Sequence, residues 1–366
     1  MPAKAGIQGP LHVVVSWTPA FPGVTKDRMC RARCLVQHSH GGDRVIEETL
    51  PSIFRIEVPL PGNPLKAINS YLISGHTRNL LIDTGMNREE CRTALESGLR
   101  ELEVDLRDTD IFITHMHADH SGLVADLGAD GATIYASRLD APAINSGPDW
   151  EGMRQFAASA GFPWDDLQKA IERHPGNRYR TSRRIDFKMV GEGDVISAGD
   201  YRFACVETPG HTRGHLCLYD ESRKLLVSGD HVLRDITPNI SVWSSVENPL
   251  AQYLKSLDKV ATLDVEMVLP GHRRAFRDLN ERVDELKRHH QVRAEEVLSI
   301  LEKGPMSPFH VAARMTWDLT YRTFGEFPVQ QKWFAGGEAV AHIRYLEEKG
   351  LVRHEAADGQ ILYALV

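Results

Sequence analysis

Between residues 45 and 276, short apolar runs alternate with longer segments in which apolar residues recur at helical spacing. Runs rich in β-branched and aromatic residues, bounded by glycine, proline or asparagine, predict β-strands. We predict strands at 53–60, 68–75, 79–85, 110–114, 132–137, 184–190, 194–200, 201–210, 215–220, 224–230 and 265–272. The helical spacing predicts helices at 87–104, 121–129, 152–161, 164–174 and 249–263, with Asn87 as the N-cap of the first.

This order of elements predicts an α/β (α+β) fold of four layers, in which helices cover two packed sheets. We expect the strands within 184–230 to form a meander, and residues 138–180 to be a helical insertion. Beyond residue 276 the pattern predicts a helix at 277–303, a short helix at 307–317, and a helix with a two-stranded hairpin over 336–366. This C-terminal order resembles a winged helix, so we divide the chain into a main domain at 45–276 and a small domain at 277–366.

The first 44 residues differ from the rest, because they contain proline, glycine and histidine with little periodicity. We interpret them as disordered or as an extension that comes from a mis-assigned start codon. The segment also contains Cys30, Cys34, His38 and His40. Their spacing is loose for a zinc knuckle, so we interpret them as part of a loop.

The composition is that of an ordinary globular protein, with 42% hydrophobic and 25% charged residues among 366. The net charge of −7 argues against a polyanionic partner. No apolar run approaches the roughly 18 residues that span a bilayer. We predict no secretory signal, because no basic segment followed by an apolar one precedes the first strand. The five cysteines are scattered and odd in number, which fits a reducing, cytoplasmic location better than a disulfide framework.

The chemistry of the chain is concentrated at the ends of four predicted strands. The first is followed by HMHADH, and three more by TPGH, SGD and PGH. These motifs supply His115, His117, Asp119, His120, His211, Asp230 and His272. Imidazoles and carboxylates are ligands of zinc and iron, and strand ends can converge on one rim of a sheet. The sequence therefore predicts a metal site.

In motif, order and approximate spacing, these residues resemble the metallo-β-lactamase superfamily over residues 45 to 275. The resemblance implies an αββα sandwich with the site at the shared edge of its sheets. It also implies two divalent metal ions, for which we expect zinc, with iron or manganese as alternatives. One ion would be bound by His115, His117 and His211, the other by Asp119, His120 and His272, and Asp230 would bridge them. Asp119 would also orient the nucleophile, a hydroxide that bridges the metals.

Several residues near these motifs are interpreted separately. Asp83 ends a strand and either fixes a metal-binding imidazole or caps a turn. We expect His215 to pack or hydrogen-bond behind His211, and His231 to point away from the ligands because it directly follows Asp230 in extended backbone. His289 and His290 are predicted at the surface of a helix. The aromatic residues of the insertion line an apolar substrate pocket or simply pack its helices, and they are Trp150, Phe156, Phe162 and Trp164.

The aspartate at position 230 narrows the range of reactions that the resemblance implies. By the family pattern, the commonest β-lactamase subclasses have cysteine or serine at this position. The resemblance is to thioesterases, lactonases, phosphodiesterases and ribonucleases, so we predict hydrolysis of an ester, thioester or lactone with an apolar portion. A metal-dependent endoribonuclease or phosphodiesterase and a mononuclear iron persulfide dioxygenase are the alternatives. Residues 281–366 contain 11 Lys/Arg and 13 Asp/Glu, which argues against nucleic acid as a partner. The C-terminal module is then a lid, a pocket wall or a homodimer contact.

Overall fold

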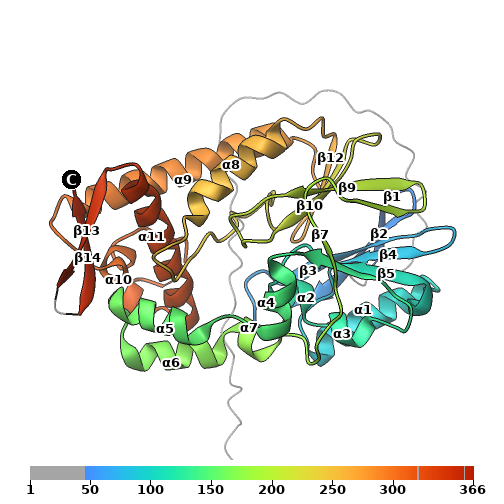
Figure 1. The fold of residues 1–366 in the computed structure, drawn as a ribbon, viewed down its shortest axis with the longest axis horizontal. Coiled ribbons are helices and arrows are strands. Elements are labelled where there is room, and N and C mark those ends of the chain that lie inside the picture. Colours follow the sequence, from blue (N-terminus) through green and yellow to red (C-terminus); the bar gives the residue numbers. More distant parts are fainter. Residues whose placement is uncertain (1–45, 320, 358) are drawn as a thin grey trace, which may run out of the picture. The chain divides into compact units, whose positions relative to one another are not determined.

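The computed structural model describes residues 46–319, 321–357 and 359–366. The predictions made for residues 1–44, including the loop with Cys30 and Cys34, lie outside the described residues. Two sheets form the centre of the described chain (Figure 1). The first has the order β1-β2-β3-β4-β5-β6-β7 and the second the order β12-β11-β10-β9-β8. A separate hairpin pairs β13 with β14.

The strands have the following bounds. In the first sheet they are β1 Ile46–Leu50, β2 Ile53–Pro59, β3 Ala67–Ile73, β4 Asn79–Ile82, β5 Thr109–Phe112, β6 Ile134–Ser137 and β7 Lys188–Val190. In the second they are β8 Val195–Ala198, β9 Tyr201–Glu207, β10 Leu216–Asp220, β11 Leu225–Gly229 and β12 Met267–Pro270. The hairpin consists of β13 Val352–Ala357 and β14 Gln360–Leu365.

The helices have the following bounds. They are α1 Glu89–Glu101, α2 Ala118–Ser121, α3 Val124–Leu127, α4 Asp140–Ser146, α5 Trp150–Ser159, α6 Trp164–Arg173, α7 Pro175–Arg178, α8 Pro249–Ala261, α9 Leu279–Leu301, α10 Pro308–Ala312 and α11 Val329–Glu348. Two short 3₁₀ helices occupy Leu106–Asp108 and Phe324–Glu326. None of the helices in the described residues is long and apolar enough to span a membrane.

The predicted four layers are present, and alternation along the strands produces them. In β4, Leu80 and Ile82 face the second sheet, while Leu81 faces helix α1 on the outside. Successive side chains of a strand point to opposite faces, so one strand contributes to two cores. Helices α8 and α9 lie on the outer side of the second sheet (Figure 1). Leu226 of β11 and Leu257 of α8 belong to the same buried cluster.

The predicted meander is wrong at its first strand. The strand over 188–190, β7, lies in the first sheet and pairs parallel with β6, Tyr135 opposite Lys188. Two parallel neighbours need a long crossover connection, and the segment 138–180 with helices α4 to α7 provides it. The meander therefore consists of β8 to β11 alone, which pair antiparallel.

The predicted N-cap of the first helix is also wrong. Helix α1 begins at Glu89 with Arg88 at the N-cap position. The side chain of Asn87 instead accepts a hydrogen bond from Arg92 and donates one to the carbonyl oxygen of Arg180. Asn87 therefore ties the start of α1 to the end of the insertion, a tertiary contact that local spacing does not reveal.

The C-terminal helices share a core with the insertion and with the second sheet. Helix α11 begins at Val329, ahead of the predicted start at 336. Its Trp333 packs in the same cluster as Phe162 of the insertion and Leu257 of α8. Phe162 is thus a packing residue, whereas Trp164 is 56% exposed. His289 is exposed as predicted, but His290 is buried, because α11 covers that side of α9.

Candidate metal centre

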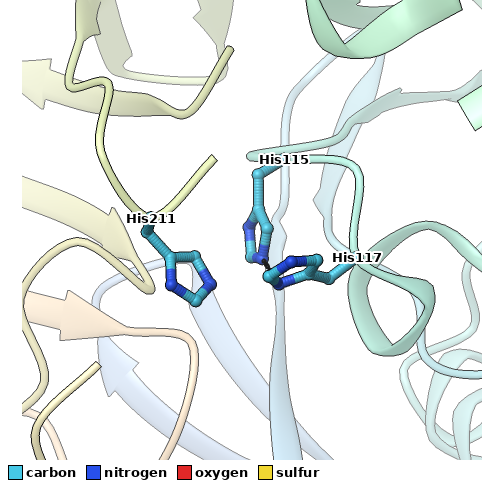
Figure 2. A group of neighbouring side chains, drawn as sticks. All are labelled: His115, His117 and His211. Atoms are coloured by element: carbon cyan, nitrogen blue, oxygen red, sulfur yellow. Dashed lines mark hydrogen bonds between the residues drawn. The ribbon is translucent and has the colours of Figure 1, made fainter. Parts of the chain in front are cut away.

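The seven predicted ligands converge at the edge where β4, β5, β11 and β12 end. Parallel pairs join β4 to β5 in one sheet and β11 to β12 in the other, so the carboxyl ends of each pair meet at one edge. The ligand atoms form three groups, each within 4.8 Å. These groups are His115, His117 and His211; His115, His120 and Asp230; and Asp119, His120 and His272. Figure 2 shows the first group, with His115 and His117 on one loop and His211 on another segment.

Hydrogen bonds to one ring nitrogen fix the orientation of three of the predicted imidazole ligands. Three rings each place Nδ1 within hydrogen-bond distance of an acceptor, which leaves Nε2 free to bind elsewhere. These contacts are His120 to Asp83 Oδ2 at 2.7 Å, His211 to the Asn239 carbonyl oxygen at 2.9 Å, and His272 to the Ala67 carbonyl oxygen at 2.7 Å. The Nε2 atoms of these three residues and Asp230 Oδ1 are buried without a hydrogen-bond partner. Buried polar atoms of this kind require a partner, and a divalent cation fits a cluster of imidazole nitrogens and carboxylate oxygens.

Asp230 is the central residue of the cluster. Its oxygens lie 3.5 Å from His120 Nε2, 3.6 Å from His211 Nε2 and 3.4 Å from His272 Nε2. These separations are long for hydrogen bonds. The carboxylate therefore faces three imidazoles without bonding closely to any of them.

The charges within the site compensate one another. Burial lowers the pKa of His115, His117 and His211, that of His117 to about 3, so these rings are neutral and offer lone pairs. Burial opposes protonation of His272 as well, but the Asp230 carboxylate raises its pKa to about 10. Burial would raise the pKa of Asp230, yet His272 and His120 hold it well below its usual range. The buried carboxylates of Asp119 and Asp230 therefore need positive charge nearby, which protons or a bound metal supply.

Asp83 lies where the sequence interpretation requires a group that fixes an imidazole. Besides His120, it accepts hydrogen bonds from the Thr114 amide at 2.8 Å and the Thr114 hydroxyl at 2.8 Å. The Thr114 oxygen in turn lies 3.0 Å from His115 Nδ1. The backbone φ of Asp83, 60°, is in the left-handed region, which aspartate adopts more readily than most residues. One buried carboxylate thereby supports two of the predicted ligands.

His215 lies behind the cluster, and both of its ring nitrogens have partners. Nδ1 lies 2.7 Å from Thr208 Oγ1, and Nε2 accepts the Asp230 amide at 3.1 Å. It therefore supports the backbone of Asp230 instead of offering a free ligand atom. His231 is buried against the ring of Tyr253 at 5.2 Å and belongs to none of the three ligand groups.

The sequence interpretation missed Asn239, whose carbonyl oxygen orients His211. It lies between β11 and α8, in a segment without helix or strand. A backbone acceptor can come from any residue type, so no sequence signal marks it. Its side chain donates a hydrogen bond to Glu338 of α11 at 3.3 Å, which links the C-terminal helices to the centre.

Comparisons with known proteins agree with this geometry. The model of the metallo-beta-lactamase superfamily matches residues 64–272. The probable metallo-hydrolase YqjP of Bacillus subtilis is 26% identical over 278 residues, which are 73% of this chain and 86% of that protein. Human acyl-coenzyme A thioesterase MBLAC2 is 29% identical over 217 residues, 57% of this chain and 74% of that protein.

Solved structures of related proteins superpose on a larger share of this chain than the sequence matches cover. A metallo-beta-lactamase family protein from Thermus thermophilus superposes with a TM-score of 0.75 at 28% identity, over 87% of this chain and 100% of that one. A beta-lactamase domain protein from Burkholderia ambifaria gives a TM-score of 0.71 at 27% identity, over 88% and 95%. The chain is therefore a metallo-hydrolase that belongs to the metallo-β-lactamase superfamily.

Proposed function

We propose that this protein hydrolyses thioesters or related esters and lactones with two divalent metal ions, zinc in the first place. The observation that carries the proposal is the buried cluster of unpartnered Nε2 atoms around Asp230. The similarity to an acyl-coenzyme A thioesterase supports a thioester as the first substrate class to test.

Each part of the cluster has a separate task in this proposal. His115, His117 and His211 would hold one ion, and Asp119, His120 and His272 the other, with Asp230 between them. Bound divalent cations supply Lewis acidity, which polarises a substrate carbonyl and lowers the pKa of water toward about 7. The Asp119 carboxylate, at the start of α2 beside His272, would orient the attacking water and accept its proton. Water would then add to the acyl carbon, and the bond to sulfur or oxygen would break. The proton taken up by Asp119 would pass through water to the leaving thiolate or alkoxide. The products would be a carboxylic acid and a thiol or alcohol, or a single hydroxy acid from a lactone.

The experiment is a panel of thioester, ester and lactone substrates, assayed before and after removal of metal with a chelator and again after zinc is restored. We expect turnover that chelation abolishes and zinc restores. His117→Ala should reduce kcat/KM by about 100-fold or more, since even partners behind the ligands contribute about 10- to 100-fold. His76→Ala is the matched control, because the His76 side chain is 88% exposed. Turnover that persists without metal, or normal rates in His117→Ala, would contradict the proposal.

A further inference from the structure

One buried carboxylate outside the ligand set joins two segments of the centre. Asp140, the first residue of α4, is only 2% exposed. Its Oδ2 accepts hydrogen bonds from the Met116 amide at 2.9 Å and the Thr212 hydroxyl at 2.7 Å. Its Oδ1 accepts the Gly214 amide at 3.0 Å.

The donors of these bonds stand next to predicted ligands. Met116 lies between His115 and His117, and Thr212 directly follows His211. The first segment follows β5 of the first sheet, and the second follows β9 of the second sheet. Asp140 therefore bridges the two segments whose three imidazoles meet in Figure 2.

The surroundings are shaped to this carboxylate. The Asp140 amide donates to Ser137 Oγ at 3.0 Å, which fixes the start of α4. At Gly214 a Cβ atom would lie 2.6 Å from Asp140 Oδ1 and 2.2 Å from Ser137 Oγ. Such distances are far below van der Waals contact, so only glycine allows this loop to approach so closely.

The ordinary use of an aspartate at this position does not explain the arrangement. An acidic residue near a helix start usually accepts hydrogen bonds from amides of its own helix, but all three donors to Asp140 lie outside α4. Burying a carboxylate is also unfavourable, and burial raises the pKa of Asp140 to about 6 despite these bonds. The unfavourable burial is offset by hydrogen bonds that connect the loop containing Met116 to the loop containing Thr212 and Gly214.

We propose that Asp140 is a positioning residue that clamps the His115–His117 loop to the His211 loop and so prepares their three imidazoles for one metal ion. This inference rests on the proposed function, since it presupposes that the centre binds metal. Ligands held in place beforehand lose less conformational freedom on binding, so the clamp should appear in the affinity for metal.

The test is the substitution Asp140→Asn, which keeps the shape but turns one acceptor oxygen into a donor amide. We expect the affinity for zinc, measured by competition with a chelator, to fall about 10- to 100-fold for one of the two ions. The second ion, assigned to Asp119, His120 and His272, should bind nearly as in the wild type.

Asp220→Asn is the matched control. Asp220 is 1% exposed and also accepts two amides and a hydroxyl, from Arg202 at 2.8 Å, Arg223 at 3.1 Å and Ser222 at 2.7 Å. It lies at the end of β10 away from the centre and joins no ligand segments. We expect Asp220→Asn to lower the Tm while zinc affinity is unchanged.

The outcomes separate the two proposals. Wild-type affinity for both ions in a folded Asp140→Asn protein would overturn the clamp and leave the proposed function standing. Wild-type protein that binds no zinc would contradict the proposed function and the clamp with it. Should Asp140→Asn fail to fold, Thr212→Val removes one donor at nearly constant shape, and unchanged zinc affinity in that variant overturns the inference.

Discussion

Two histidines outside the metal centre are buried without charge. His290 of α9 and His342 of α11 place Nδ1 and Nε2 3.2 Å apart. Burial, with a smaller contribution from the charge of Arg293, lowers the pKa of His290 to about 2 and that of His342 to about 3. Both rings are therefore neutral in the folded protein at any pH at which it is expected to fold.

Their burial makes stability depend on pH. In the unfolded chain a histidine titrates near 6.5, so below that pH the unfolded state binds protons that the folded state does not. The neutral form contributes fully above about pH 6.5, and its contribution is lost as the pH falls toward the folded pKa. We expect a loss of about 1 kcal/mol in the free energy of unfolding per histidine at about pH 5.5.

His342→Gln should remove one of these titrations. The difference in free energy of unfolding between wild type and variant, from urea denaturation, should shrink between about pH 8 and about pH 5.5. Other buried histidines are common to both proteins and cancel in the difference. His76→Gln, at an exposed position, should give no such trend. If the difference in free energy of unfolding between wild type and His342→Gln does not change with pH, His342 is not held neutral by burial.

At the scale of elements, helix α11 supports the metal centre from the C-terminal part of the chain. Its Glu338 accepts the Asn239 side chain at 3.3 Å, and the Asn239 carbonyl oxygen holds His211. The Val242 amide donates to the Gly337 carbonyl oxygen at 3.2 Å. A Cβ atom at Gly336 would lie 2.8 Å from the Trp243 ring. The segment 239–243 therefore rests closely on α11.

Glu338→Ala should loosen this support. Without its acceptor, the Asn239 side chain no longer fixes the carbonyl group that orients His211. We expect a decrease of about 10-fold in zinc affinity and in kcat/KM. Glu348→Ala is the matched control. Glu348 also belongs to α11 and also accepts a hydrogen bond from an asparagine side chain, that of Asn248, but it lies at the surface. If the two substitutions change zinc affinity and kcat/KM equally, α11 stabilises the fold but has no specific effect on the metal centre.

The described strands other than β1, and most of the described helices, could be predicted because their apolar patterns are local. The sheet of β7 could not, since parallel pairing with β6 depends on how the segment 138–180 crosses over. The side chains of the centre were marked by motifs at strand ends, and the structure brings all seven together. Asp140 and Asn239 were missed, because one acts across two sheets and the other through its backbone.

At the scale of the whole molecule, the fold unites two halves at one edge. The first sheet delivers His115 to His120 and the second delivers His211, Asp230 and His272. Each of the three ligand groups takes residues from both sheets. Packing of the sheets, through Leu80, Phe112 and Leu218 among others, is thus a condition for the centre.

The measurement that tests the proposed metal centre most directly is the metal content of the protein, determined by mass spectrometry after purification without chelator or affinity metal. We predict about two zinc ions per chain in the purified protein, or about two after zinc is added to metal-free protein. About one iron per chain would contradict the proposed dinuclear hydrolase and favour the persulfide dioxygenase. Protein that contains no metal and binds no added zinc would contradict the metal centre itself.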